Sequence, residues 1–380
     1  MSAKLGLVGL PNAGKSTLFN ALTSGKAQVA PYPFTTTDRN VGVAPVQDAR
    51  LDTLARLVPH DRVIPTNLEC VDIAGLVKGA HQGEGLGNQF LSHVFAVDVL
   101  LHVVRCFEDG NVAHVMGSVD PARDVDMIAT ELLLKDLEII ERRFEKERKL
   151  AKSGDQHAQA LVEQLAHWKD ALGQGRSIRT LGLAPDRHPK VFGVELLSSK
   201  PVIYVGNVDE ASLTHPPPAG TLSVPALRSA PTAFAPPAQR LIELAKQDGS
   251  ALVFICAKLE AELAELEAAD RAAMMAELGV AESALPQIVR AGYATLGLIT
   301  FFTTASRLLQ AWTVPRGTTA PHAVGTIHSD FERKFIRAEV ISVEQLAACG
   351  GEGPARAKGL LRTEGKDYVV QDGDVLHVKI

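Results

Sequence analysis

The chain has 380 residues, of which 46% are hydrophobic and 22% are charged, and its formal net charge at pH 7 is −5. This composition is that of a globular protein with room for two or three domains, and the negative charge argues against a protein that coats nucleic acid. The apolar runs are too short for a membrane span, the start leaves no room for a signal peptide, and the four scattered cysteines form no C-x-x-C pair, so we expect a cytoplasmic protein.

A phosphate-binding loop is the first motif in the chain. A predicted buried strand at residues 5–8 is followed by Gly-Leu-Pro-Asn-Ala-Gly-Lys-Ser-Thr, which fits G-x-x-x-x-G-K-[ST] of P-loop NTPases, and then by helical spacing over residues 16–22. Glycines let backbone N–H groups turn inward, and the helix N-terminus adds positive charge toward phosphates. The residues predicted to bind the nucleotide here are Asn12, Ala13, Gly14, Lys15, Ser16 and Thr17.

The magnesium site is predicted from three stretches. Lys15 is expected to reach the β- and γ-phosphates, and the Ser16 hydroxyl to ligate Mg²⁺. A loop over residues 29–38 contains three consecutive threonines, one of which would join the Mg²⁺ shell, and spacing alone leaves open which one. Asp72, at the end of a predicted strand, can hold a Mg²⁺-bound water, and Gly75 can offer its N–H to the γ-phosphate.

The group that orients the attacking water is harder to identify. Leu76 stands where many regulatory GTPases carry a glutamine, and a leucine cannot orient water. The glycine-rich residues 78–88 are predicted to form a second switch region. His114 follows the predicted strand at residues 97–104, on the side where open α/β sheets place their ligands. It is the candidate catalytic residue, and a plain surface histidine is the alternative.

The middle of the chain is predicted to be helical. From residue 121, apolar residues recur with helical spacing on both sides of a break at Ser153-Gly154. This pattern predicts an antiparallel helical hairpin, which either projects as an arm or packs on the sheet.

The base-recognition motif follows a predicted strand over residues 201–206. The chain has Asn207-Val208-Asp209-Glu210 where GTPases carry Asn-Lys-x-Asp. Asn207 is expected to brace the P-loop, whereas the carboxylate of Glu210 is one methylene too long to pair with guanine. A site that loses such a pair loses its preference for the base that carries it, so we predict ATP or relaxed specificity.

The rest of the chain is predicted in three parts. Residues 212–238 hold seven prolines and should form a surface loop, and a strand at residues 251–255 leads into a helical region over residues 259–291. From residue 298, short strand-like runs that include residues 368–370 alternate with turns and indicate a small α+β module. Its basic cluster around residues 333–337 fits a solvated face and an RNA contact equally well.

Together the motifs resemble the YchF/Obg-like ATPase family, a branch of the Obg-related P-loop NTPases. The resemblance is carried by residues 9–17, by Val-Asp-Ile-Ala-Gly-Leu-Val-Lys-Gly-Ala at 71–80, by Gly-Glu-Gly-Leu-Gly-Asn-Gln-Phe at 83–90, by Asn-Val-x-Glu at 207–210, and by Asp-Phe-Glu-x-x-Phe-Ile-Arg-Ala-Glu at 330–339. It implies an α/β P-loop (Obg-type G) domain over residues 1–120 and 196–296, an inserted antiparallel coiled coil over 121–195, and a C-terminal ubiquitin-like (β-grasp) TGS domain over 297–380.

The resemblance also implies roles for individual residues. It selects Thr36 as the Mg²⁺ ligand beside Ser16 and Asp72, although the threonine loop departs from the family's usual Pro-Phe-Cys-Thr-Ile-Glu-Pro-Asn in ways that spare Thr36. It places the adenine contact on the main chain of Val208, with Asn207 and Glu210 on either side. His114 takes the place of the missing glutamine, and Asn12 matches a residue that helps to hold K⁺ in potassium-activated relatives.

The function predicted from these features is that of a Mg²⁺-dependent, cytoplasmic and monomeric ATPase. It would hydrolyse ATP in preference to GTP, with K⁺ as a candidate activator, and act as a nucleotide-switched regulatory factor on the ribosome, without membrane or DNA partners. Two alternatives stay open: a GTP-hydrolysing ribosome assembly or translation factor, and a binding scaffold that the nucleotide stabilises with negligible turnover.

Overall fold

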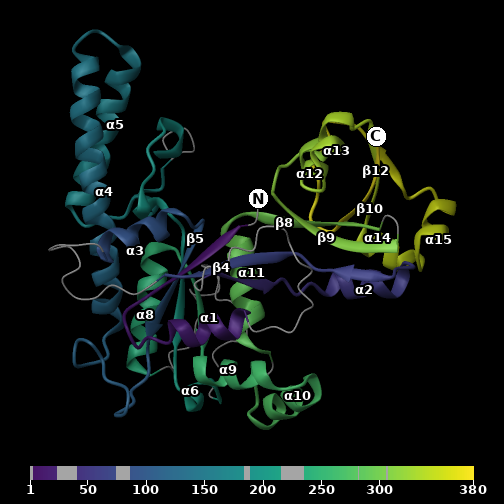
Figure 1. Cartoon of the computed structure of the whole chain (residues 1–380), viewed down its shortest axis with the longest axis horizontal. Coiled ribbons are helices and arrows are strands. Elements are labelled where there is room, and N and C mark those ends of the chain that lie inside the picture. The colour runs from purple at the N-terminus through teal and green to yellow at the C-terminus, as the bar shows by residue number, and fades with distance from the viewer. Residues whose placement is uncertain are drawn as a thin grey trace.

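The computed structural model describes residues 3–23, 41–73, 86–183, 189–214, 235–280, 282–304 and 307–380. Within these ranges the strands form two six-stranded sheets, ordered β2-β4-β1-β5-β6-β7 and β11-β10-β12-β8-β9-β3 (Figure 1). None of the described helices combines the length and the hydrophobicity that a membrane span requires.

The first sheet is largely parallel. Its strands are β1 (Lys4–Val8), β2 (Val41–Pro45), β4 (Asn67–Asp72), β5 (Val99–Arg105), β6 (Val202–Asn207) and β7 (Ala251–Ile255). Only the β2–β4 pair is antiparallel among the described strands of this sheet. The near-continuous apolar runs of β5 and β6 are buried along their whole length, as expected for strands that are covered on both faces. The carboxyl ends of β1, β4, β5, β6 and β7 therefore share one edge.

Helices cover both faces of this sheet. On one face lie α1 (Lys15–Thr23), α9 (Ala257–Glu265) and α11 (Ala284–Thr295), and on the other lie α3 (Leu86–Phe95), α4 (Pro121–Ala151) and α8 (Pro236–Asp248). Leu18 and Ile288 are fully buried against the first face, and Val94 and Leu241 against the second. The α/β architecture predicted from the sequence is confirmed.

Helix α4 has two parts with different surroundings. Its N-terminal half packs on the first sheet through Val125 and Ile128, whereas its C-terminal half pairs with α5 (Gln156–Gly173) and projects away from the sheet (Figure 1). Ile140 of α4 and Trp168 of α5 are fully buried in the core that includes this pair. The two alternatives predicted for the hairpin thus each describe one half of α4.

Between α5 and the first sheet, the part of the chain that the structure describes contains three short 3-10 helices. They are η2 (Ile178–Leu181), η4 (Pro189–Phe192) and η5 (Leu197–Ser199). Asp136 of α4 is fully buried and accepts the N–H groups of Leu197 and Ser198, both at 2.7 Å. A single carboxylate therefore fastens the end of the returning segment to the middle of α4.

The second sheet contains strands from both ends of the chain. Its strands are β3 (Arg62–Ile64), β8 (Leu298–Thr303), β9 (Leu308–Pro315), β10 (Arg337–Ser342), β11 (Arg362–Glu364) and β12 (Asp374–Lys379). The helices that accompany it are α12 (Ala320–Gly325), α13 (Ser329–Lys334), α14 (Val343–Cys349) and α15 (Glu352–Ala357).

The helical character predicted for residues 259–291 is confirmed. The region is divided among α9, α10 (Ala268–Glu277) and α11, because the chain turns extended at Leu266 and left-handed at Gly279. One local prediction was wrong. The strand expected at 368–370 is a single bridge from Val369 to Thr319, because the backbone on either side bonds to a loop rather than to a strand.

Residues 49–64 lie between two strands of the first sheet in sequence, yet they pack on the second. Helix α2 (Ala49–Leu57) places Leu51 and Leu54 in one core with Phe302 and Ile341, and β3 pairs in parallel with β9. At the start of α2, Arg50 bonds to Asp48 and Asp372 and lies over the Phe302 ring.

We expect replacement of Arg50 by alanine to loosen α2 from the second sheet by about 1–3 kcal/mol, the usual value of hydrogen bonds to charged groups. The measurement is hydrogen exchange of amides in β3. Arg56→Ala is the matched control, because Arg56 bonds only within α2, to Thr53, among the described contacts. Equal exchange in the two variants would contradict the prediction.

Candidate nucleotide-binding site

The turn between β1 and α1 has the backbone of a phosphate cradle. Gly9, Asn12 and Gly14 have φ values of +152°, +63° and +98°. A Cβ on Gly9 would lie 2.3 Å from the Val103 carbonyl oxygen, and a Cβ on Gly14 would lie 2.4 Å from the Asn207 side-chain nitrogen. Glycine is therefore needed at both positions for conformation and for space, and left-handed residues of this kind turn backbone N–H groups inward.

Lys15 begins α1 and is mostly buried. Its Nζ donates to the Leu10 carbonyl oxygen at 3.1 Å, so the side chain folds back over the loop. Burial lowers the pKa of Lys15, and the nearby Asp72 charge opposes that shift. A phosphate oxygen would be a stronger partner for this ammonium than a carbonyl, because the bond would join opposite charges.

The oxygen atoms of Ser16 and Asp72 meet at the ends of the loop and of β4. Ser16 Oγ donates to Asp72 Oδ2 at 3.0 Å. The other carboxylate oxygen, Asp72 Oδ1, is buried without a hydrogen-bond partner among the described residues. A buried carboxylate oxygen in that state is costly, and a hard cation bound by oxygen ligands would satisfy it. The pair therefore fits Mg²⁺. The predicted residues Thr36, Gly75 and Leu76 lie outside the described residues.

Asn207 joins the P-loop to the start of α9. Its Nδ2 donates to the Ala13 carbonyl oxygen at 2.9 Å, and its Oδ1 accepts the Ala257 N–H at 3.0 Å. The side chain is buried, so both bonds are shielded from water. This one carboxamide links Ala13, which lies 194 positions before Asn207, to Ala257, which lies 50 positions after it.

A cavity of about 460 Å³ runs from the P-loop past Asn207 to α9, a volume in the range of small-molecule sites. Its lining residues are Asn12, Gly14, Thr17, Phe107, Val112, Asn207, Ala257, Lys258, Ala261, Glu262 and Glu265. Phe107 and Val112 were not predicted, although they lie in the loop after β5, at the sheet edge that singled out His114.

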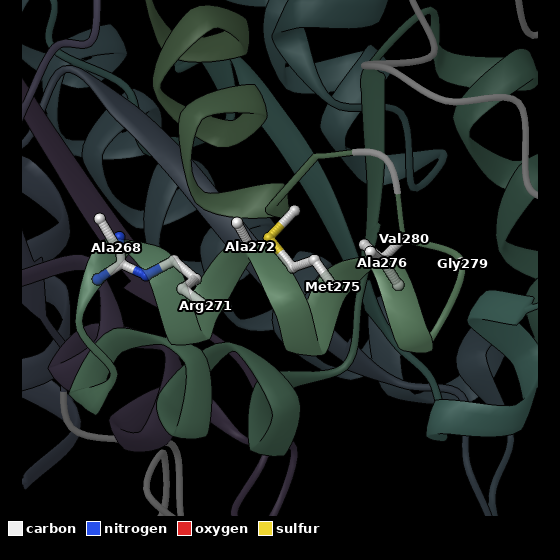
Figure 2. Close-up of a pocket in the computed structure, with 7 residues that line it drawn as sticks. All are labelled: Ala268, Arg271, Ala272, Met275, Ala276, Gly279 and Val280. Atoms are coloured by element: carbon white, nitrogen blue, oxygen red, sulfur yellow. The ribbon is translucent and has the colours of Figure 1, made fainter.

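A second cavity, of about 530 Å³, lies along α10 and the turn after it (Figure 2). Its lining is mostly alanine with Met275 and Val280, and its one charged side chain, Arg271, already donates to the Leu263 and Leu266 carbonyl oxygens. This cavity has a single cation and no side-chain oxygen that could ligate Mg²⁺, so it lacks the set of contacts that a magnesium-bound triphosphate needs. The nucleotide site is therefore assigned to the smaller cavity at the P-loop.

Val208 and Glu210 follow Asn207 at the start of α6 (Glu210–Thr214). The Val208 side chain is buried, and its N–H donates to the Ile255 carbonyl oxygen at 2.8 Å. Glu210 is exposed in the first turn. The Val208 N–H is committed to the sheet, so the main-chain group that Val208 can turn to a base is its carbonyl.

His114 follows a residue that contacts the P-loop, but its own ring bonds to α4 and does not line the cavity at the P-loop. The Asn12 Nδ2 donates to the carbonyl oxygen of the neighbouring Ala113 at 3.0 Å, whereas His114 Nε2 lies 2.8 Å from Asp124 Oδ2. The His114 side chain is only 5% exposed, so it is no plain surface histidine. Asp124 was not predicted, because no motif signals a contact between a loop histidine and the following helix.

The chain is similar to known proteins over its whole length. Residues 4–142 match a family model described as 50S ribosome-binding GTPase, and residues 298–380 match the model of the YchF GTPase C-terminal domain, described as a protein of unknown function. The chain is 45% identical over 379 residues to the ribosome-binding ATPase YchF of Bacillus subtilis, covering 100% of this chain and 99% of that protein. With the same-named protein of Escherichia coli O157:H7 it shares 44% identity over 377 residues, 99% of each chain.

One solved structure is similar over the whole chain. It is the YchF GTPase of Schizosaccharomyces pombe, which is 34% identical, has a TM-score of 0.84, and is matched over 98% of its chain and 100% of this one. High identity to curated proteins over the full length, with the same fold, shows that the chain belongs to the YchF family.

Proposed function

We propose that this chain is a ribosome-binding ATPase, the name carried by its bacterial relatives. The observation that carries the proposal is the Asn207 brace, which brings a P-loop and a base-side turn together around one cavity. It supports binding of a whole nucleoside triphosphate, since phosphates at the loop and a base near α9 would be held by one rigid connection.

The phosphate end of the site would bind charge. The backbone N–H groups of residues 12–17 would surround the phosphates, and the Lys15 ammonium would exchange its carbonyl partner for phosphate oxygens. Ser16, Thr36 and Asp72 are the proposed holders of Mg²⁺, with the Gly75 N–H on the γ-phosphate. When bound, Mg²⁺ neutralises the charge that develops on the transferred phosphoryl group.

The base end favours adenine. The Val208 N–H is engaged by Ile255, so its carbonyl is the group available, and a carbonyl accepts from the 6-amino group of adenine but repels the O6 atom of guanine. Glu210 replaces the aspartate that would pair with guanine. The runner-up function is hydrolysis of GTP, which the names of the S. pombe protein and of one family model favour.

Isothermal titration of the full chain should show ATP binding about tenfold to a hundredfold more tightly than GTP, the value of one hydrogen bond replaced by repulsion. ADP and GDP are the control ligands, because the ratio of their affinities reports the preference for adenine over guanine without a contribution from the γ-phosphate. Glu210→Asp is expected to reduce the difference in affinity between ATP and GTP. Tighter binding of GTP would overturn the adenine assignment and favour the runner-up.

Hydrolysis is assigned to His114, because Leu76 has no group that could orient water. The Asn12 Nδ2 is used by Ala113, which leaves its carboxamide oxygen for a K⁺ ion that would activate turnover. If turnover is negligible even in K⁺ and ribosome co-sedimentation does not depend on nucleotide, the chain is instead a scaffold.

The domain roles are part of the same proposal. Residues 1–120 and 196–296 would form the Obg-type nucleotide domain, 121–195 a coiled-coil insertion, and 297–380 a ubiquitin-like TGS domain, with α2 and β3 of the first range packed on the second sheet. The projecting α4–α5 pair and the mixed second sheet support these assignments. We further propose a cytoplasmic monomer whose partner, the ribosome, is reached through parts outside the nucleotide site.

A further inference from the structure

The loop between β5 and α4 is bonded both to the P-loop and to α4. On the P-loop side, Asn12 Nδ2 donates to the Ala113 carbonyl oxygen at 3.0 Å. On the helix side, the His114 ring meets Asp124 in the first turn of α4. The His114 and Asp124 side chains are 5% and 4% exposed, so this second contact is shielded from water.

Both ring nitrogens of His114 are in use. Nδ1 accepts the backbone N–H of Met116 at 3.1 Å, so it carries no proton in this arrangement. Nε2 must then carry the proton and donate it to Asp124 Oδ2 at 2.8 Å. No donor or acceptor of the imidazole is left for a water at the P-loop. In this arrangement His114 cannot orient a nucleophile.

Asp124 is itself firmly placed. Its other oxygen, Oδ1, accepts from the Arg123 guanidinium at 3.1 Å, and Arg123 also donates to Ser118. The carboxylate lies in the first turn of α4, where the helix dipole favours negative charge. The charge, the burial and the fixed geometry make Asp124 a strong acceptor for the histidine.

We propose that Asp124 is a positioning residue that holds His114 away from the nucleotide, and that hydrolysis requires this hydrogen bond to open. The inference rests on the proposed role of His114 in hydrolysis. Breaking the bond frees Nε2–H and lets the loop turn the ring toward the P-loop, which Ala113 already contacts. The position of His114 before hydrolysis is thereby set by α4 and not by the phosphate site.

Asp124→Asn is the variant that weakens the hold. One amide cannot accept from both His114 and Arg123, so its NH₂ group must face one of two donors. At saturating ATP we expect kcat to rise about tenfold, the effect of losing one charge-assisted hydrogen bond, with KM unchanged. In a His114→Ala background the same change should have no effect on kcat.

Asp120→Asn is the matched control. Asp120 caps the same helix turn by accepting from the Ala122 and Arg123 N–H groups and does not touch the His114 ring. Asparagine caps a helix about as well as aspartate, so this variant should keep the start of α4 and leave kcat unchanged. A kcat of Asp124→Asn that equals that of Asp120→Asn, or that falls below the wild type, would overturn the inference.

A spectroscopic measurement on the wild-type chain keeps the test independent of variant folding. The hydrogen-bonded Nε2–H of His114 should give a slowly exchanging imidazole proton signal that disappears when a non-hydrolysable ATP analogue and Mg²⁺ are added. Its persistence in the complex would overturn the inference. A different result would show that the proposed catalytic role of His114 is wrong: His114→Ala alone would then hydrolyse ATP at the wild-type rate.

Discussion

Replacing Asn207 with alanine is expected to weaken ATP binding about a hundredfold. The variant leaves the Ala13 carbonyl and the Ala257 N–H buried without their partner, and each unpaired group costs about 1–3 kcal/mol. The P-loop and α9 would then no longer be held at the spacing that one nucleotide must bridge. Titration calorimetry with ATP measures the loss, and far-UV circular dichroism checks that the fold is kept.

Asn207→Asp separates the two bonds. The carboxylate can still accept the Ala257 N–H, but it cannot donate to the Ala13 carbonyl oxygen. We expect an affinity between those of the wild type and of the alanine variant. ATP binding by Asn207→Ala within about threefold of the wild type would show that the brace is not needed.

Replacing Asp136 with alanine should detach the segment around η5 from α4. The amides of Leu197 and Ser198 would lose a buried carboxylate that accepts both, at a cost of about 2–5 kcal/mol. Hydrogen exchange of these two amides reports the change directly. Glu138→Ala is the control on the same helix, because Glu138 is exposed and pairs only with Lys135 and Arg142 among the described residues.

The pH dependence of the same site has a defined sign. Burial is the main cause that raises the pKa of Asp136 from 3.8 to about 6 in the folded chain. The stabilisation from this shift is fully present below pH 3.8 and is lost as the pH rises through about 6. Relative to Asp136→Asn, the wild type should lose about 1 kcal/mol between pH 5 and pH 7. Constant or rising relative stability over that range would contradict the assignment.

The features of the site that could be predicted from the sequence are those encoded by residues that are adjacent in the chain. A P-loop is one contiguous motif, and Asn207 ends a strand whose place in the sheet is implied by the P-loop fold. Asp136 could not be linked to residues 197–198, because a buried carboxylate inside a helix gives no sign of partners 61 and 62 positions away. The His114–Asp124 contact was missed for the same reason.

The pattern of residues 49–64 was also uninformative about its neighbours. An amphipathic helix such as α2 reveals that it has an apolar face, but not which of two sheets covers that face. The breaks around α10 were missed because a stretch rich in alanine and glutamate has helical composition on both sides of a turn.

Because α2 and β3 pack on the second sheet, they can reach their final places only after the C-terminal part of the chain has been synthesised. Arg62 pairs with Leu308, so a strand made early must wait for about two-thirds of the chain before its partner exists. Until then Leu51, Leu54 and Val58 have no core to enter, because the residues that cover them come from the second sheet and its helices. A nascent chain that stops before residue 298 would therefore carry an amphipathic helix whose apolar face is uncovered, which makes premature termination an aggregation hazard.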